Sequence, residues 1–130
     1  MATGGRKTQL QVTHTLSKTI NYNDTGITAG VVVGILPAGA VAHITRVLTS
    51  TAFNGTTSVA LSVGTTATGT QFINATDVRT AAARVDTVVP IASAGPYASD
   101  TTIYASVAFG GTTGSAGVAT VVVEYCPNIG

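Results

Sequence analysis

Few side chains in this sequence are of the types that perform chemistry. The 130 residues contain five Asp and Glu residues in total, two His residues and one Cys residue. Catalysis requires several such groups to converge with pKa values that suit the reaction. His14 lies on an apolar strand face and His43 in a second apolar stretch, and neither has a carboxylate nearby on the same face. We therefore interpret both as core or interface residues rather than as metal ligands.

No local motif supplies the missing groups. The nucleophile motif G-x-S-x-G is absent. The Gly-rich stretches GTTATGT and GGTTGSAG lack the Lys-Ser/Thr pair of a phosphate-binding loop. Cys126 would need a His partner that the sequence does not place, so we interpret it as an incidental thiol. The sequence predicts no catalytic residue, no cofactor and no metal, and hence a protein that is not an enzyme.

Charge is scarce and scattered along the chain. Charged residues make up 8% of the sequence, against roughly 25% in an average soluble protein. The formal net charge is +1, and Arg6-Lys7 is the one adjacent basic pair. A nucleic-acid-binding surface needs a basic stripe or stacking aromatic side chains, and neither is visible. We therefore expect no nucleic-acid partner.

The apolar content points to an assembly rather than to a membrane. Hydrophobic residues make up 45% of the chain, yet no apolar run approaches the roughly 18 residues that cross a membrane. The N-terminus lacks the apolar core of a signal peptide, so we expect no membrane partner and synthesis in a cytoplasm. A monomer with so few charges would be poorly soluble. Much of the neutral surface is therefore predicted to be covered by other subunits.

The elements that position these residues read as strands. Alternation of apolar and polar side chains, the signature of a strand, recurs in the stretches 10–22, 58–63, 84–91, 101–109 and 118–125. Pro90 would restrict its strand to an edge or an end. The Gly-rich stretch Gly110–Gly117 is expected to be a loose hairpin connection, after which Val118–Tyr125 pairs back. Gln71–Ala83 is ambiguous, since a short strand there could be followed by a helical turn capped by Asn74 or Thr76.

The central stretch, Gly30–Leu48, contains two apolar runs around Leu36-Pro37-Ala38-Gly39. Pro37 presets the backbone for a turn and Gly39 tolerates positive φ, so the chain reverses there. We expect two adjacent strands at the centre of the domain, with one face on the core and the other against a second copy or another surface. Together these elements predict an all-β fold, an antiparallel β-sandwich of about eight strands that is jelly-roll-like.

The predicted domain covers residues 8–130, and an N-terminal arm, residues 1–7, is expected to lie on a neighbour. The arm and the loops Thr49–Thr57 and Gly64–Ala83 are the parts expected to reach a partner. Asp77, Asp86 and the nearby Arg residues fit either an intersubunit ion pair or a solvated loop. The candidate interface residues are Arg6, Lys7, Val32, Val41, His43, Arg46, Phe53, Asn54, Arg79 and Arg84.

Three segments resemble a known group of proteins: GVVVGILPAGAVAHITRV, TAFNGTTSVALSVGTTA and the ending VATVVVEYCPN. The chain resembles small structural proteins encoded among the head genes of tailed bacteriophages. This resemblance implies a jelly-roll capsid decoration, or cement, protein on the capsid surface of the virion. Its partners would be the major capsid protein and further copies of itself, with a homotrimer favoured over a homodimer. It would stabilise the shell by bridging neighbouring coat subunits.

Two other functions remain open at this point. A jelly roll of a phage tail or fibre would have a structural role or bind carbohydrate, for which several exposed Tyr residues on one concave face would be the signal. An enzyme would need a deep pocket that joins His14 or His43 to a carboxylate.

Overall fold

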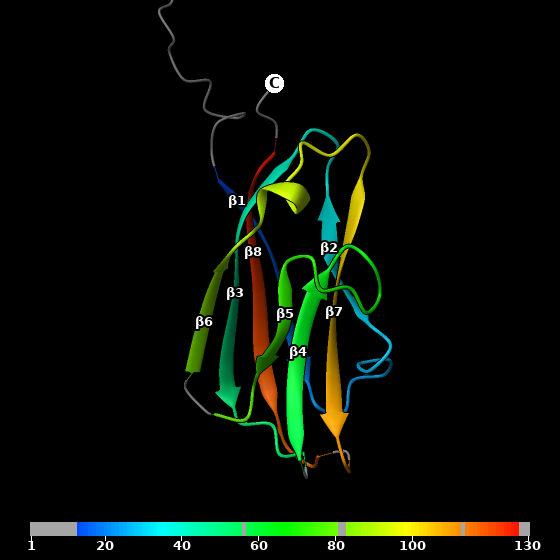
Figure 1. Ribbon diagram of the computed structural model, residues 1–130, viewed down its shortest axis with the longest axis vertical. Helices are drawn as coiled ribbons and strands as arrows, with labels where there is room; N and C mark the ends of the chain where they lie inside the picture. The colour runs from blue at the N-terminus through cyan, green and yellow to red at the C-terminus, as the bar shows by residue number, and fades with distance from the viewer. Residues whose placement is uncertain (1–12, 56, 81–82, 113, 128–130) are drawn as a thin grey trace, which may run out of the picture.

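The computed structural model describes residues 13–55, 57–80, 83–112 and 114–127. Within these residues, eight strands form two four-stranded antiparallel sheets that pack face to face (Figure 1). The one helical element of the described residues is a single 3-10 turn, η1 (Ile91–Ser93). The described part of the chain therefore holds no helix that is long and apolar enough to span a membrane.

The order of the strands defines the topology. The strands are β1 (His14–Asn21), β2 (Val31–Leu36), β3 (Val41–Thr51), β4 (Ser58–Gly64), β5 (Ile73–Asp77), β6 (Ala83–Val88), β7 (Thr101–Gly110) and β8 (Val118–Cys126). One sheet has the order β1-β8-β3-β6 and the other β2-β7-β4-β5. The first strand pairs with the last, the second with the seventh, the third with the sixth and the fourth with the fifth. This nested pairing is the jelly roll, which confirms the predicted fold class.

The central stretch differs from the prediction in one respect. The chain reverses where expected, and Gly39 has a φ of 86°. However, β2 and β3 lie in different sheets, so they are not adjacent: β2 pairs with β7, whereas β3 lies between β8 and β6. Turn residues specify that a chain reverses, and the same residues serve a hairpin or a crossing between sheets.

The last connection is corrected in the same way. β8 does not pair back onto β7 but lies between β1 and β3 in the opposite sheet, so 110–117 is a crossing and not a hairpin. In the ambiguous stretch, β5 includes both Asn74 and Thr76, so neither begins a helical turn. β6 ends at Val88 rather than continuing to Ile91, and Pro90 follows the end of this edge strand as predicted.

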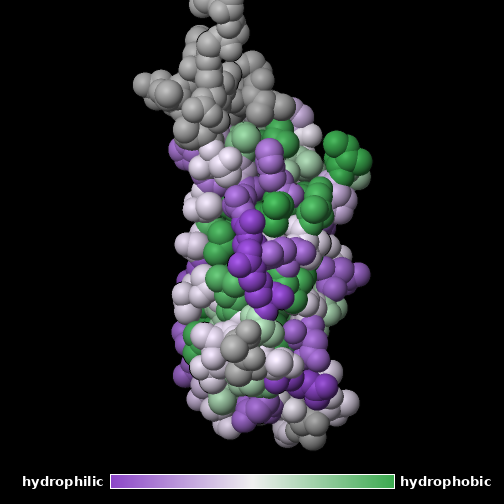
Figure 2. Space-filling model, turned by 90° about the vertical axis from the view of Figure 1, so that its left-hand side faces the viewer, coloured by the Kyte–Doolittle hydropathy of each residue, from purple (hydrophilic) through white to green (hydrophobic). Residues whose placement is uncertain are grey.

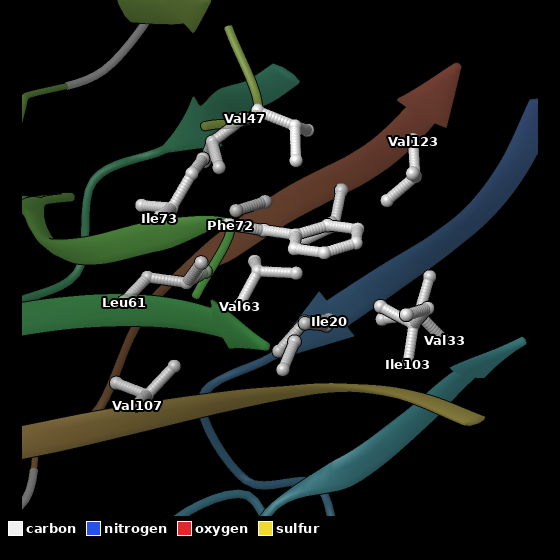
Figure 3. Close-up of a cluster of buried hydrophobic side chains, with 14 of the residues drawn as sticks. Ile20, Val33, Val47, Leu61, Val63, Phe72, Ile73, Ile103, Val107 and Val123 are labelled. Carbon is white, nitrogen blue, oxygen red and sulfur yellow. The ribbon is translucent and has the colours of Figure 1, made fainter. Parts of the chain in front are cut away.

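The core fills the space between the two sheets (Figure 3). Alternate residues of each strand point inward, as the period-two pattern predicts. The predicted inward residues of the fourth, seventh and eighth strands that are buried are Val59, Leu61, Val63, Ile103, Ala105, Val107, Val121, Val123 and Tyr125. Phe72 is also fully buried and its ring lies among side chains of both sheets in Figure 3.

Phe53 belongs to this core rather than to an interface. Its side chain is 1% exposed, because it is packed against the backbone of Gly117. A Cβ atom at Gly117 would lie 2.4 Å from the Phe53 ring. Phe53 therefore offers almost no surface to a partner in the single chain, and its burial does not support the predicted interface role. An isolated apolar residue before a Gly-rich stretch fits an exposed loop and a core position equally well.

Candidate interaction surface

The outer face of the sheet β1-β8-β3-β6 carries a row of four charged side chains. Register places Arg46 of β3 opposite Asp86 of β6, and Arg84 lies two residues before Asp86 on the same face. The Arg84 Nε atom lies 3.0 Å from Asp86 Oδ1, and the Arg46 Nε atom lies 3.4 Å from the same oxygen. Arg46 also pairs with Glu124 of β8. The row contains two positive and two negative groups, so it has no net charge.

The contact between Arg84 and Asp86 shifts the pKa values of both groups. A hydrogen bond from the Arg84 guanidinium lowers the pKa of Asp86, and the same bond raises the pKa of Arg84. A carboxyl group whose pKa is lowered on folding stabilises the protein above its unfolded pKa and loses that effect as pH falls through the folded pKa. Both side chains are exposed, so solvent screens the pair and it contributes little to stability.

Aliphatic side chains flank the charged row. Ile44 and Leu48 of β3 and Val88 of β6 share its face, and Val88 is 74% exposed. Figure 2 views the molecule from the side on which β6 lies in Figure 1, and it shows a hydrophilic stripe with hydrophobic patches on both sides. Exposed aliphatic side chains beside ionic groups make this face a candidate for contact with another protein.

A shallow apolar groove of about 530 Å³ continues from this face at the end of β6. Its lining residues are Val41, Ala42, His43, Ile44, Val88, Val89, Ile91 and Ala94. Two backbone hydrogen bonds hold the chain after β6 against β3: Val89 N–H donates to the His43 oxygen at 2.8 Å, and Ala42 N–H to the Ala94 oxygen at 2.8 Å. The Ile91 side chain is 90% exposed at the rim of the groove.

The opposite sheet, β2-β7-β4-β5, has an outer face of a different kind. Val32 and Ile35 of the edge strand β2 are 49% and 54% exposed. Register places them opposite Tyr104 and Thr102 of β7. Next to these, β7 and β4 present small side chains, including Ala108 opposite Ala60. Its strands contribute one charged residue, Asp77 at the end of β5, which lies opposite Ala60 and 3.6 Å from Arg79. The rest of the described part of this face is uncharged, so it offers mainly apolar contact.

The structure gathers four of the predicted interface residues on one sheet. Val41 and His43 line the groove, while Arg46 and Arg84 belong to the charged row. Val32 is exposed on the other sheet. Arg6 and Lys7 lie outside the described residues, so the predicted arm is not placed.

Asn54 and Arg79 are engaged within the chain. The Asn54 side-chain oxygen accepts the N–H groups of Ser115 at 2.7 Å and Ala116 at 2.9 Å, which joins the loop after β3 to the loop before β8. Arg79 donates to the Thr57 backbone oxygen at 2.8 Å and lies 3.6 Å from Asp77. Both side chains therefore have structural roles in the isolated domain.

Sequence reasoning missed Val88 and Ile91 as surface residues. The signal for Val88 was present, because Arg84, Asp86 and Val88 alternate along one strand and must share a face. No local signal marks Ile91, whose exposure depends on the path that the chain takes after β6.

The groups considered for catalysis do not converge among the described residues. His43 lines the groove, and every other lining residue is apolar. The His14 ring lies 5.9 Å from the ring of Tyr125, and Cys126 is a half-buried free thiol. A search of the described ranges finds no group of three His, Cys, Asp or Glu residues that could hold a metal ion.

The Tyr residues do not form a sugar-binding platform. Tyr125 is buried, and the remaining three are half-buried at separate places in the fold. Tyr97 lies in the loop before β7, where its hydroxyl donates to the Ser93 backbone oxygen, and burial raises its pKa. Tyr104 lies on the outer face of β7, opposite Val32. The gathering of exposed Tyr that would favour a carbohydrate-binding module is therefore not found.

Comparison with known proteins places the fold. No protein-family model matches the sequence, and no curated protein matches it. Among solved structures, a chain in the capsid asymmetric unit of cyanophage Pam1 is similar, with a TM-score of 0.63 and 19% identity over 94% of this chain and 96% of that one. A chain in the capsid of Ralstonia phage GP4 has a TM-score of 0.65 and 19% identity over 93% and 88%. This chain has the fold of phage capsid components. The resemblance to phage head proteins is thus confirmed in its structural neighbours.

Proposed function

We propose that the protein is a structural component of a phage virion, a capsid decoration or cement protein. The observation that carries this proposal is the jelly roll, shared over nearly the full length of chains that belong to two phage capsids. The scarcity of charge, at 8% of residues, and the exposed aliphatic side chains on both outer faces support a protein that works while covered by other subunits.

The proposed mechanism is multivalent binding on the outside of the shell. The protein would contact the major capsid protein, and copies of it would associate with one another. Weak contacts to several coat subunits then add, because the first contact raises the effective concentration for the next. Bridged coat subunits must break more contacts before they separate, so the shell resists heat and expansion. The role is proposed to be non-catalytic.

The experiment compares capsids that lack the protein with the same capsids after purified protein is added back. We expect the temperature at which the shell releases its DNA to rise on addition, and image reconstruction to show the jelly roll on the outer surface. Equal release temperatures, or density on a tail or fibre instead of the shell, would count against the proposal. Protein unfolded by heating before addition serves as the control for non-specific protein effects.

A further inference from the structure

The edges of the two sheets are not equally protected. An open edge strand exposes unpaired backbone groups, and proteins commonly guard such edges with bulges, short strands or inward-pointing charges. β2 has a register shift between Val32 and Gly34. β5 pairs with β4 at three positions only, with a shift between Leu61 and Val63. β1 carries Lys18 on its inward side, opposite the buried Val121.

β6 has none of these features within the described residues. It pairs with β3 at six consecutive positions without a register shift. Its inward residues, Ala83, Val85 and Thr87, are uncharged. In Figure 1, β6 lies at the rim of its sheet with no further strand beyond it. Of the four edges, β6 is therefore the one best suited to accept another strand.

The hydrogen-bonding direction of β6 follows from one observed bond. Val89 N–H donates to the His43 oxygen of β3. Along an antiparallel strand, the backbone N–H and C=O groups of successive residues point alternately to one neighbour and to the other. The backbone groups of the odd-numbered residues of β6 therefore point toward β3. The N–H and C=O groups of Arg84, Asp86 and Val88 then point to the open edge. The two residues with opposite charges are thus also the residues whose backbone can bond to a new strand.

We propose that a second copy of this chain pairs with this edge, β6 against β6 and antiparallel, about a two-fold axis between the two Val85 residues. In this register, Arg84 of each copy lies opposite Asp86 of the other. An isologous contact requires such self-complementarity, since each residue pair occurs twice. The two copies would form one continuous sheet of eight strands.

The neighbouring registers are disfavoured by charge. A slide of one hydrogen-bonded pair places Arg84 opposite Arg84, or Asp86 opposite Asp86, depending on its direction, and like charges directly across a ladder are destabilising. A slide of a single residue would turn the outward side chains of one copy toward the inward side of the other. The charges of Arg84 and Asp86 therefore favour a second copy of the chain as the partner and also favour one register of pairing.

The contact would also shelter exposed apolar surface. Val88 lies on β6 itself, and the Ile91 side chain stands just beyond the end of this strand. Because one strand per copy is a small interface, we expect a monomer–dimer equilibrium that depends on concentration rather than a permanent dimer. An isologous contact closes with two copies, so this edge favours a dimer over the trimer expected from the sequence.

The first experiment uses sedimentation of the full chain over a concentration series. The variants are Arg84→Asp, which makes the outer face of β6 acidic, and Asp86→Arg, which makes it basic. Each variant alone places like charges across the axis, and we expect dimerisation to weaken about tenfold. An equal mixture of the two restores opposite charges at both pairs, so a heterodimer should recover the wild-type association. Undiminished association of each variant alone, or no recovery in the mixture, overturns the proposal, provided that circular dichroism shows both variants folded.

The second experiment tests the register by oxidative cross-linking in a Cys126→Ser background. The two Val85 residues form a non-hydrogen-bonded pair, whose Cα atoms are about 4.5 Å apart and within disulfide range. Val85→Cys should therefore yield a covalent dimer. Thr87→Cys is the matched control on the same face of the same strand, since the two Thr87 residues would be about 13 Å apart. Cross-linking of the Thr87 variant in place of the Val85 variant would overturn the register, and a trimer with neither cross-link would overturn the contact. Neither experiment contains capsid, so failure here is distinguishable from failure of the proposed virion role.

Discussion

At the scale of single residues, Thr45 and Gly117 each affect the free energy of unfolding in a way that can be measured separately. The Thr45 side chain is fully buried between β8 and β6, and its hydroxyl has no hydrogen-bond partner among the described residues. Gly117 has a φ of 147° and meets the ring of Phe53. The Thr45 hydroxyl is a buried polar group whose lost hydrogen bonds to water are not replaced. The backbone at Gly117 has a conformation that only Gly adopts without strain.

Thr45→Val should stabilise the domain. The substitution keeps the branched shape and removes a buried hydroxyl, so we expect the free energy of unfolding to rise by about 1 kcal/mol. In a domain of this size, that change corresponds to an increase in Tm of about 4 °C. Calorimetry measures it directly. The control is Thr15→Val on the exposed face of β1, which should change Tm little. A lower Tm for Thr45→Val would contradict the prediction.

Gly117→Ala should destabilise the domain by about 3 kcal/mol, because the new methyl group meets the Phe53 ring while the backbone is strained. Gly26→Ala is the matched control. Gly26 has a φ of 79°, but a Cβ atom there has nothing within 4 Å, so strain acts alone and the expected loss is about 1 kcal/mol. Urea unfolding measures the free energy of unfolding of both variants, and their difference gives the effect of the clash with Phe53 apart from backbone strain. Equal losses of free energy in the two variants would contradict this account.

At the scale of elements, the jelly roll depends mainly on crossings between sheets, since among the described strands only β4 and β5 follow one another within one sheet. The crossing before β8 is fixed by Asn54, which accepts two backbone N–H groups and also donates to the Ser115 hydroxyl at 3.0 Å. The amide thereby ties two connections that are 61 residues apart in the sequence.

Asn54→Ala should loosen this end of the sandwich. Three hydrogen bonds are lost at an exposed site, and we expect the free energy of unfolding to fall by about 2 kcal/mol. Hydrogen exchange should accelerate at the Ser115 and Ala116 amides. Ser115→Ala removes only one of the three bonds and should leave these amides protected. Unchanged exchange in Asn54→Ala would show that the loops hold each other without the side chain.

At the scale of the whole molecule, low charge governs behaviour in solution. The net charge is +1, the sequence pI is about 7.9, and both outer faces carry exposed aliphatic side chains. Electrostatic repulsion between molecules vanishes near the pI, which leaves apolar contact to dominate. This low charge is consistent with a protein whose surface is covered by other subunits in an assembly.

The isolated protein should therefore be least soluble near pH 8. Turbidity and light scattering across a pH series measure this minimum. The double variant Ile35→Asp and Ile91→Asp adds one charge to each of two exposed sites, so it should remain soluble at pH 8 and shift the minimum to lower pH. A wild-type protein that stays monodisperse at high concentration near its pI would contradict the link between composition and assembly.

The sequence by itself determined where most strands lie and which side chains they bury. The inward positions of β4 and β8 follow from an alternation that is written in neighbouring residues, because successive side chains of a strand point to opposite faces. From the composition we predict few groups that could form an active site and a surface that other subunits cover.

Only the tertiary structure decided which strands are neighbours. β2 and β3 are joined by a turn that the sequence marks clearly, yet they belong to different sheets, because turn residues fix a reversal while burial over the whole chain selects the partner strand. The same holds for the surface. Arg46, Asp86 and Glu124 come from three strands far apart in sequence, and register alone brings them into one row beside an open edge.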